Sequence, residues 1–143
     1  MNRRIVFLVA SIVLTAGLAA EESVYVPTNA ERARWTMGDM RSWATALGAY
    51  HQDNGAYPAA NSIDTLKPSV EPMYIRIAPL TDAWGTAYKV VSTKDGFRII
   101  SAGADRKFDD ATWGLASNEL PSWSDDAVID QSGMRFFRSW KYE

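Results

Sequence analysis

Residues 46–58 read ALGAYHQDNGAYP, and within this stretch a helical pattern gives way to an irregular one. Upstream, apolar side chains recur every three or four residues from Met37 to Tyr50, which places them on one face of a helix. Gly55 predicts that this helix ends near Asp53, because glycine adopts the left-handed conformation that closes a helix without steric cost. One long helix is therefore expected to precede the rest of the fold.

The start of the helix and the segment after it also carry local signals. Thr28 or Asn29 can cap the first turn, and Glu31 places a negative charge where the helix dipole favours one. After the helix, residues 57–79 predict an irregular connection, because proline interrupts regular structure. The prolines of this connection are Pro58, Pro68, Pro72 and Pro79.

The second half of the chain changes to the pattern of short strands. Ala87–Val91 and Phe97–Ile100 are rich in β-branched and aromatic residues, and Asp95-Gly96 between them is a strong hairpin signal. Ala127–Ile129 and Met134–Phe137 form a second such pair. A helix and a sheet can bury their apolar faces only against another element. The sequence therefore predicts an α+β fold, with one long N-terminal helix packed on a three- to four-stranded antiparallel sheet.

The composition excludes several classes of protein. The chain of 143 residues has a formal net charge of −2 and 47% hydrophobic residues, which predicts a folded domain without the basic surface of a nucleic-acid binder. It has no cysteine and one histidine, which rules out disulfides, thiolate metal sites and sites built from several histidines. That histidine, His51, is expected to lie exposed at the end of the helix. Because no nucleophile elbow, phosphate-binding loop or zinc motif is present, we expect a non-enzymatic protein.

The N-terminus has the layout of a targeting segment. A basic start, the uncharged apolar run Ile5–Leu18 and small residues around Ala19 predict that residues 1–20 are a secretory signal peptide. An uncleaved membrane anchor is the alternative, but the apolar run is short for a membrane-spanning helix. Residues 21–28 are expected to be a linker and residues 29–143 one globular domain. The mature protein is then periplasmic or secreted without a membrane contact, and membrane-anchored if the leader stays.

A turn at residues 79–88 links the irregular connection to the strands. Asp82 can accept hydrogen bonds from backbone N–H groups of this turn, and Gly85 permits the bend. Trp84 can fill the junction between helix and sheet. We expect these three residues to have structural rather than chemical roles.

Three aspartates flank the long loop 103–124. Asp105 ends one expected strand, whereas Asp125 and Asp126 begin the next. If these strands pair, the loop ends converge and the carboxylates meet, and such a set suits Ca²⁺, which takes about six to eight oxygen ligands. A solvated acidic loop and a loop closed by apolar packing are the alternatives.

Five motifs follow one another in an order that is typical of a known family. They are residues 46–58, Pro72–Ile75, Pro79–Tyr88, Gly96–Asp105 and the Asp125-Asp126 pair. In this order they resemble the G-type major pseudopilin of bacterial type II secretion systems, over about Glu31 to Trp140. The resemblance implies a structural module that acts through contacts with secretion or cell-envelope proteins and through self-association.

The resemblance also implies a role for the acidic loop. In that family a Ca²⁺ ion lies in this loop and holds the sheet together. Carried over, Asp105 and Asp126 are ligands and Ala102 supplies a backbone carbonyl. Asp125 is the candidate for the remaining carboxylate, although it is adjacent to Asp126 rather than one residue apart, as the family pattern has it.

Two further features of the sequence bear on function. Trp113 and Trp123 in the long loop can stack on sugar rings, which would make the chain a periplasmic glycan-binding module, or they can pack the loop onto the sheet. A pseudopilin also keeps a Gly-Phe-Thr-Leu-Ile-Glu signature after its leader, and its apolar segment continues into the long helix. Here that signature is absent and Pro27 separates the two segments. We therefore expect a soluble periplasmic relative of the globular domain.

Overall fold

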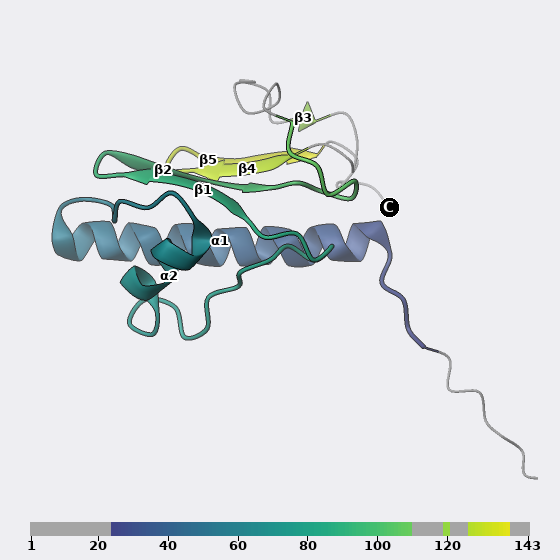
Figure 1. Ribbon diagram of the computed structural model, residues 1–143, viewed down its shortest axis with the longest axis horizontal. Coiled ribbons are helices and arrows are strands. Elements are labelled where there is room, and N and C mark those ends of the chain that lie inside the picture. The colour runs from purple at the N-terminus through teal and green to yellow at the C-terminus, as the bar shows by residue number, and fades with distance from the viewer. Residues whose placement is uncertain (1–23, 110–118, 121–125, 138–143) are drawn as a thin grey trace, which may run out of the picture.

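The structure is a computed structural model that describes residues 24–109, 119–120 and 126–137. These residues form the helices α1 (Asn29–Asn54) and α2 (Ile63–Val70), followed by the strands β1 (Lys89–Thr93), β2 (Gly96–Ser101), β3 (Glu119–Leu120), β4 (Ala127–Asp130) and β5 (Gly133–Phe137). Figure 1 shows α1 lying lengthwise along one face of the sheet. The predicted α+β fold is confirmed.

Both ends of α1 are closed by the local signals that the sequence carries. Thr28 is the N-cap, and its Oγ1 accepts a hydrogen bond from the Glu31 N–H at 3.2 Å, while the Glu31 carboxylate accepts one from the Thr28 N–H at 2.8 Å. At the other end, Gly55 has a φ of 73° and donates its N–H to the carbonyl of His51 at 2.8 Å. The predicted beginning and end of the helix are both confirmed, because each depends on neighbouring residues only.

The sheet has the strand order β1-β2-β4-β5-β3. The two predicted hairpins supply four antiparallel strands, and β2 pairs with β4 in a register that places Arg98 opposite Asp130 and Ser101 opposite Ala127. The two-residue strand β3 pairs with β5 in parallel and lies within the stretch that we expected to be loop. A strand this short carries no periodicity of its own, so its pairing depends on the tertiary structure.

The core lies between α1, α2 and the inner face of the sheet. Met40, Trp43 and Leu47 of α1 are fully buried, as the helical spacing predicts. The strand residues packed in the same cluster are Val90, Phe97, Ile99, Ala127 and Ile129. The indole Nε1 of Trp43 donates a hydrogen bond to the carbonyl of Pro79 at 2.7 Å, which joins α1 to the connection before the strands.

The helix α2 lies where an irregular connection was expected. Ser62 and Thr65 form a capping box at its start, and Pro68 stands inside the helix. Its side chains Ile63, Leu66 and Val70 are buried against the core. The proline content of this segment favoured a loop, but burial of three aliphatic side chains, each worth about 1.5–3 kcal/mol, outweighs the loss of one helical hydrogen bond.

The N-terminal expectations lie mostly outside the described residues. The predicted signal peptide, residues 1–20, is not among them, and neither is the beginning of the linker. The part of the linker that is described, residues 24–28, has no helix or strand. Within the ranges 24–109, 119–120 and 126–137, no helix has both the length and the hydropathy to cross a membrane.

Replacing Trp43 tests the core contact of α1. The Trp43→Ala variant should lose about 3–5 kcal/mol of unfolding free energy, because the indole is fully buried. The Trp43→Phe variant should lose less, about 1–3 kcal/mol, since the ring stays but the Pro79 carbonyl loses its donor. Urea denaturation measures both. Trp35→Ala is the control, because Trp35 lies on the same helix but is half exposed; equal losses at positions 35 and 43 would contradict the assignment.

Candidate functional site

The carboxylate of Asp82 holds the turn between the α2 connection and the strands. Asp82 is buried, and its Oδ1 accepts hydrogen bonds from the N–H groups of Trp84 at 3.0 Å and Thr86 at 2.9 Å. Its Oδ2 accepts a hydrogen bond from the Ser101 hydroxyl at 2.7 Å. The predicted role of Asp82 as an acceptor in the turn is confirmed. The bond from Ser101, which fixes the turn to the end of β2, could not be predicted from local sequence.

The same turn is fastened to the first half of α1. The indole Nε1 of Trp84 donates to the side-chain oxygen of Asn29 at 3.0 Å, and the ring is buried at the junction of helix and sheet, as expected. The backbone of Ala83 donates its N–H to the hydroxyl of Thr36 at 3.0 Å and accepts a hydrogen bond from the Arg32 guanidinium at 2.6 Å. Three hydrogen bonds thus join α1 to the turn.

The structure brings two of the predicted calcium ligands to neighbouring strand ends. Ser101, the last residue of β2, pairs with Ala127, the first residue of β4, so Ala102 and Asp126 stand just beyond the paired strand ends. Both are fully buried. Oδ2 of Asp126 accepts a hydrogen bond from the N–H of Asp109 at 2.8 Å, which draws the beginning of the long loop towards its end. The predicted convergence of the loop ends is therefore found.

Asp105 lies in the turn that follows Ala102. Its side chain is exposed, and Oδ1 accepts a hydrogen bond from the N–H of Lys107 at 2.9 Å. Asp125 lies outside the described residues, and no group of three or more acidic, histidine or cysteine side chains in the described part is placed to hold a metal. The carboxylates of Asp105 and Asp126 and the carbonyl of Ala102 are hard oxygen donors, so the described part of the donor set fits Ca²⁺ chemically.

The two tryptophans proposed for sugar stacking, Trp113 and Trp123, lie outside the described residues, so the glycan-binding alternative stays a prediction. His51, the one histidine, is half-buried rather than exposed as expected, because its ring stacks on Tyr57 at a centroid distance of 4.4 Å. Tyr57 thus folds back onto the end of α1 and packs at the edge of the core.

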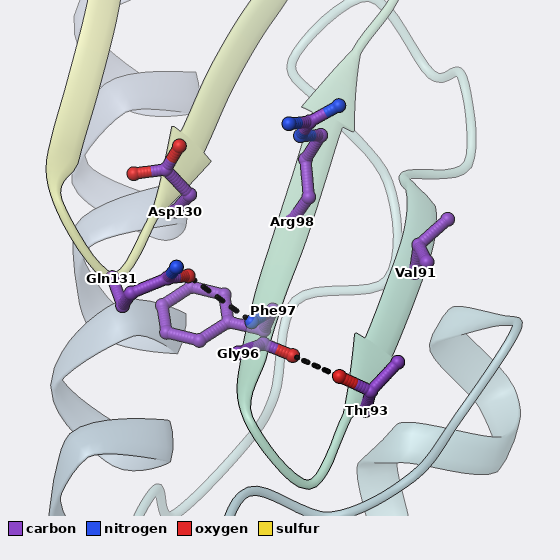
Figure 2. Close-up of a pocket in the computed structure, with 7 residues that line it drawn as sticks. All are labelled: Val91, Thr93, Gly96, Phe97, Arg98, Asp130 and Gln131. Atoms are coloured by element: carbon purple, nitrogen blue, oxygen red, sulfur yellow. Dashed lines mark hydrogen bonds between the residues drawn. The ribbon is translucent and has the colours of Figure 1, made fainter.

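A groove of about 370 Å³ lies on the face of the sheet turned away from α1. Figure 2 shows the residues that line it. Val91 and Arg98 project from β1 and β2, and Asp130 stands on β4 directly opposite Arg98. The amide oxygen of Gln131 accepts a hydrogen bond from the Phe97 N–H at 3.2 Å at the end of this groove. The lining residues combine no nucleophile with a general base, so the groove gives no support to catalysis. Sequence reasoning missed it, because a face left uncovered by its neighbours has no local signal.

Comparison with known proteins agrees with the fold and with the motif order. A family model described as Type II secretion system (T2SS), protein G, matches residues 25–113. The chain is 32% identical over 111 residues to the Type II secretion system core protein G of Pseudomonas aeruginosa, and the match covers 67% of this chain and 78% of that protein. No solved structure matches the chain. This chain therefore belongs to the type II secretion system protein G family and is a pseudopilin-like protein.

A matched pair of glycine substitutions tests the backbone conformation of the Asp82 turn. Gly85 has a φ of 89°, so Gly85→Ala should cost about 1–2 kcal/mol of unfolding free energy although the added methyl meets no other atom. Gly48 lies inside α1 with equally open space, so Gly48→Ala should stabilise by about 0.5–1 kcal/mol. Thermal and urea unfolding measure both. A destabilised Gly48 variant, or an unaffected Gly85 variant, would show that backbone conformation does not limit these positions.

Proposed function

We propose that this chain is a structural component of a type II secretion system and acts without catalysis, through contacts with other secretion proteins and with further copies of itself. The observation that carries the proposal is the family match over residues 25–113, which includes both helices, β1, β2 and the Asp82 turn. In this stretch the polar side chains of the motifs bond to the protein's own backbone and side chains. Such a domain works by presenting surfaces on a rigid frame.

The place of action follows from the same family. Secretion-system proteins of this kind belong to the cell envelope, and the sequence of residues 1–20 favours export. We therefore place the globular domain on the periplasmic side of the envelope, either released after cleavage of the leader or held at the membrane by it.

The calcium site of the acidic loop is part of the proposal. Asp105, Asp126 and the Ala102 carbonyl would hold the ion, with Asp125 as a further carboxylate. The supporting observation is that the loop ends already meet, since Ser101 pairs with Ala127, Ala102 follows Ser101 and Asp126 precedes Ala127. A bound Ca²⁺ would supply a cross-link between the two strand ends and would offset the cost of burying the Asp126 charge.

A thermal melt of the full chain in EDTA and then in excess Ca²⁺ tests this site. Ligand binding to the native state stabilises by about 2.7 kcal/mol at a hundredfold excess over the dissociation constant, so the midpoint should rise by about 5–10 °C. Asp105→Ala should abolish the rise, and because Asp105 is exposed the variant should still fold.

The control is Asp64→Ala, which removes another exposed carboxylate, in the first turn of α2. This variant should keep the full response to Ca²⁺, and Mg²⁺ should not replace Ca²⁺ in the wild type. Equal midpoints in EDTA and in Ca²⁺ would overturn the calcium site and leave the loop to be closed by packing.

Recovery of partners tests the secretion role itself. The full chain, tagged at its C-terminus, is expressed in the bacterium that encodes it, cross-linked in intact cells and purified in detergent. Mass spectrometry should identify other type II secretion proteins, enriched at least about tenfold over a tagged periplasmic protein of similar size. Recovery of no secretion component would contradict the proposed function.

A further inference from the structure

A second groove runs along α1, beside the connection that leads from α2 to the Asp82 turn. Its volume is about 410 Å³. It is lined by Asp39, Ser42, Ile75, Arg76, Ile77 and Pro79. Of the turn at residues 79–88 only Pro79 lines this groove, and none of the proposed calcium ligands does.

The carboxylate of Asp39 lies half-buried in this groove. Burial raises its pKa above the usual range of aspartate, and within the described ranges the carboxylate has no hydrogen bond or ion pair. Arg76 also lines the groove but forms no ion pair with Asp39. A partly buried charge that lacks a partner is costly, and the cost disappears when a cation reaches it.

The core also holds a buried hydroxyl that lacks a hydrogen-bond partner within the described ranges. The side chain of Tyr88 is only 3% exposed, and its OH has no hydrogen-bond partner among the described residues. Burial, and after it the charges of Asp39 and Asp82, raises the pKa of this hydroxyl. Native structures rarely leave a buried polar group such as the Tyr88 hydroxyl without a hydrogen bond. The Asp39 carboxylate, in contrast, is half-buried and still reaches solvent at the groove.

The rim of the groove is apolar and open. Ile77, which lines the groove, is 72% exposed. Trp35 is not a lining residue, but it is 50% exposed on the same helix. Trp35 stands four residues before Asp39 on α1, so the two side chains lie on the same helix face. An acidic group between exposed aliphatic and aromatic side chains is complementary to a segment that carries a basic residue next to an apolar one.

The chain itself displays such a segment after β2. Arg106 and Lys107 are exposed, and among the described residues neither forms an ion pair. The next residue, Phe108, is 37% exposed, and the Lys89 ammonium lies over its ring at 5.6 Å from the ring centroid. The groove itself carries one acidic and one basic side chain, Asp39 and Arg76, which form no ion pair with each other. A cation of the 106–108 segment can therefore pair with the Asp39 carboxylate, while the aromatic ring can cover the exposed Ile77.

We propose that the Asp39 groove is the docking site for residues 106–108 of a second copy of this chain. Lys107 or Arg106 of one copy would reach the Asp39 carboxylate of the next, and Phe108 would lie on Ile77. The groove and the 106–108 segment are different surfaces of the chain, so the contact between two copies is heterologous. In a dimer, one copy still has a free groove and the other a free 106–108 segment, and each can bind a further copy. The proposal rests on the self-association that the proposed function includes, and it names the interface.

The absence of cysteine from the chain makes the test direct. Two full-length variants, Ile77→Cys and Phe108→Cys, are produced together in the bacterium that encodes the protein and treated with a short bismaleimide. A cross-linked dimer of the two variants is expected. The matched control replaces Ile77→Cys by Asp64→Cys, which puts an exposed thiol on α2 outside the groove, and this pair should give no dimer.

Charge reversal then tests whether the contact between copies depends on the negative charge of Asp39. Adding Asp39→Lys to the Ile77→Cys copy should lower the yield of dimer at least about tenfold, because like charges replace an attractive pair. Adding Arg106→Asp and Lys107→Asp to the Phe108→Cys copy should restore the yield to within about twofold. The milder Asp39→Asn should lower the yield without lowering the melting midpoint, since it removes a charge that the free protein holds at a cost.

Two results would overturn the proposal. One is a yield from the Ile77 and Phe108 pair no higher than that of the Asp64 control. The other is a yield that Asp39→Lys leaves unchanged. If either occurs while other secretion proteins are still recovered with the tagged chain, the groove is wrong and the secretion role stands. If the tagged chain also recovers no secretion protein, the proposed function fails with it.

Discussion

The rest of the fold depends on one buried charge. The carboxylate of Asp82 has lost nearly all contact with water, and it is compensated by two backbone N–H groups of its own turn and by the Ser101 hydroxyl at the end of β2. An ionised group in such a place is destabilising unless its hydrogen bonds are made. The turn can therefore take this conformation only when β2 is in place. The requirement couples a local turn to the sheet.

The position of the Asp82 turn affects both the proposed calcium site and the Asp39 groove. Ala83, next to Asp82, is held by Thr36 and Arg32 of α1, so the turn sets the position of the helix relative to the sheet. Ser101 lies beside the loop ends at which Ala102 and Asp126 meet. On the other side, the connection that reaches the turn through Pro79 forms one wall of the Asp39 groove. A single arrangement of α1 and β2 thus presents a proposed ion site and a proposed docking groove together.

The sequence predicted those parts of the fold that depend on neighbouring residues. The capping box at Thr28, the glycine end of α1 at Gly55 and the hairpin at Asp95-Gly96 are short-range signals, and all three are confirmed. The helix α2 was missed because Pro68 argues locally against a helix, whereas the reason for the helix is burial against the core. The strand β3 was missed because two residues carry no pattern, and its partner is distant in the chain.

The candidate sites also contain one part that the sequence could predict and another that depends on tertiary contacts. The convergence of the loop ends at Ala102 and Asp126 could be foreseen, because antiparallel pairing of two recognisable strands requires it. The bond from Ser101 to Asp82 and the groove around Asp39 could not. Both depend on which side chains α1 and the 71–79 connection bring together. On the helix alone, Asp39 has the pattern of an ordinary solvated charge next to the apolar face.

The account depends most directly on the coupling between Asp82 and Ser101, which a double-mutant cycle measures. Urea unfolding of the wild type, Asp82→Ala, Ser101→Ala and the double variant gives four unfolding free energies. If the buried carboxylate ties the turn to β2, the double variant should lose less than the sum of the single losses, by at least about 1 kcal/mol. Losses that add within about 0.5 kcal/mol would show that the two residues act independently, and the turn would then not be what sets α1 against the sheet.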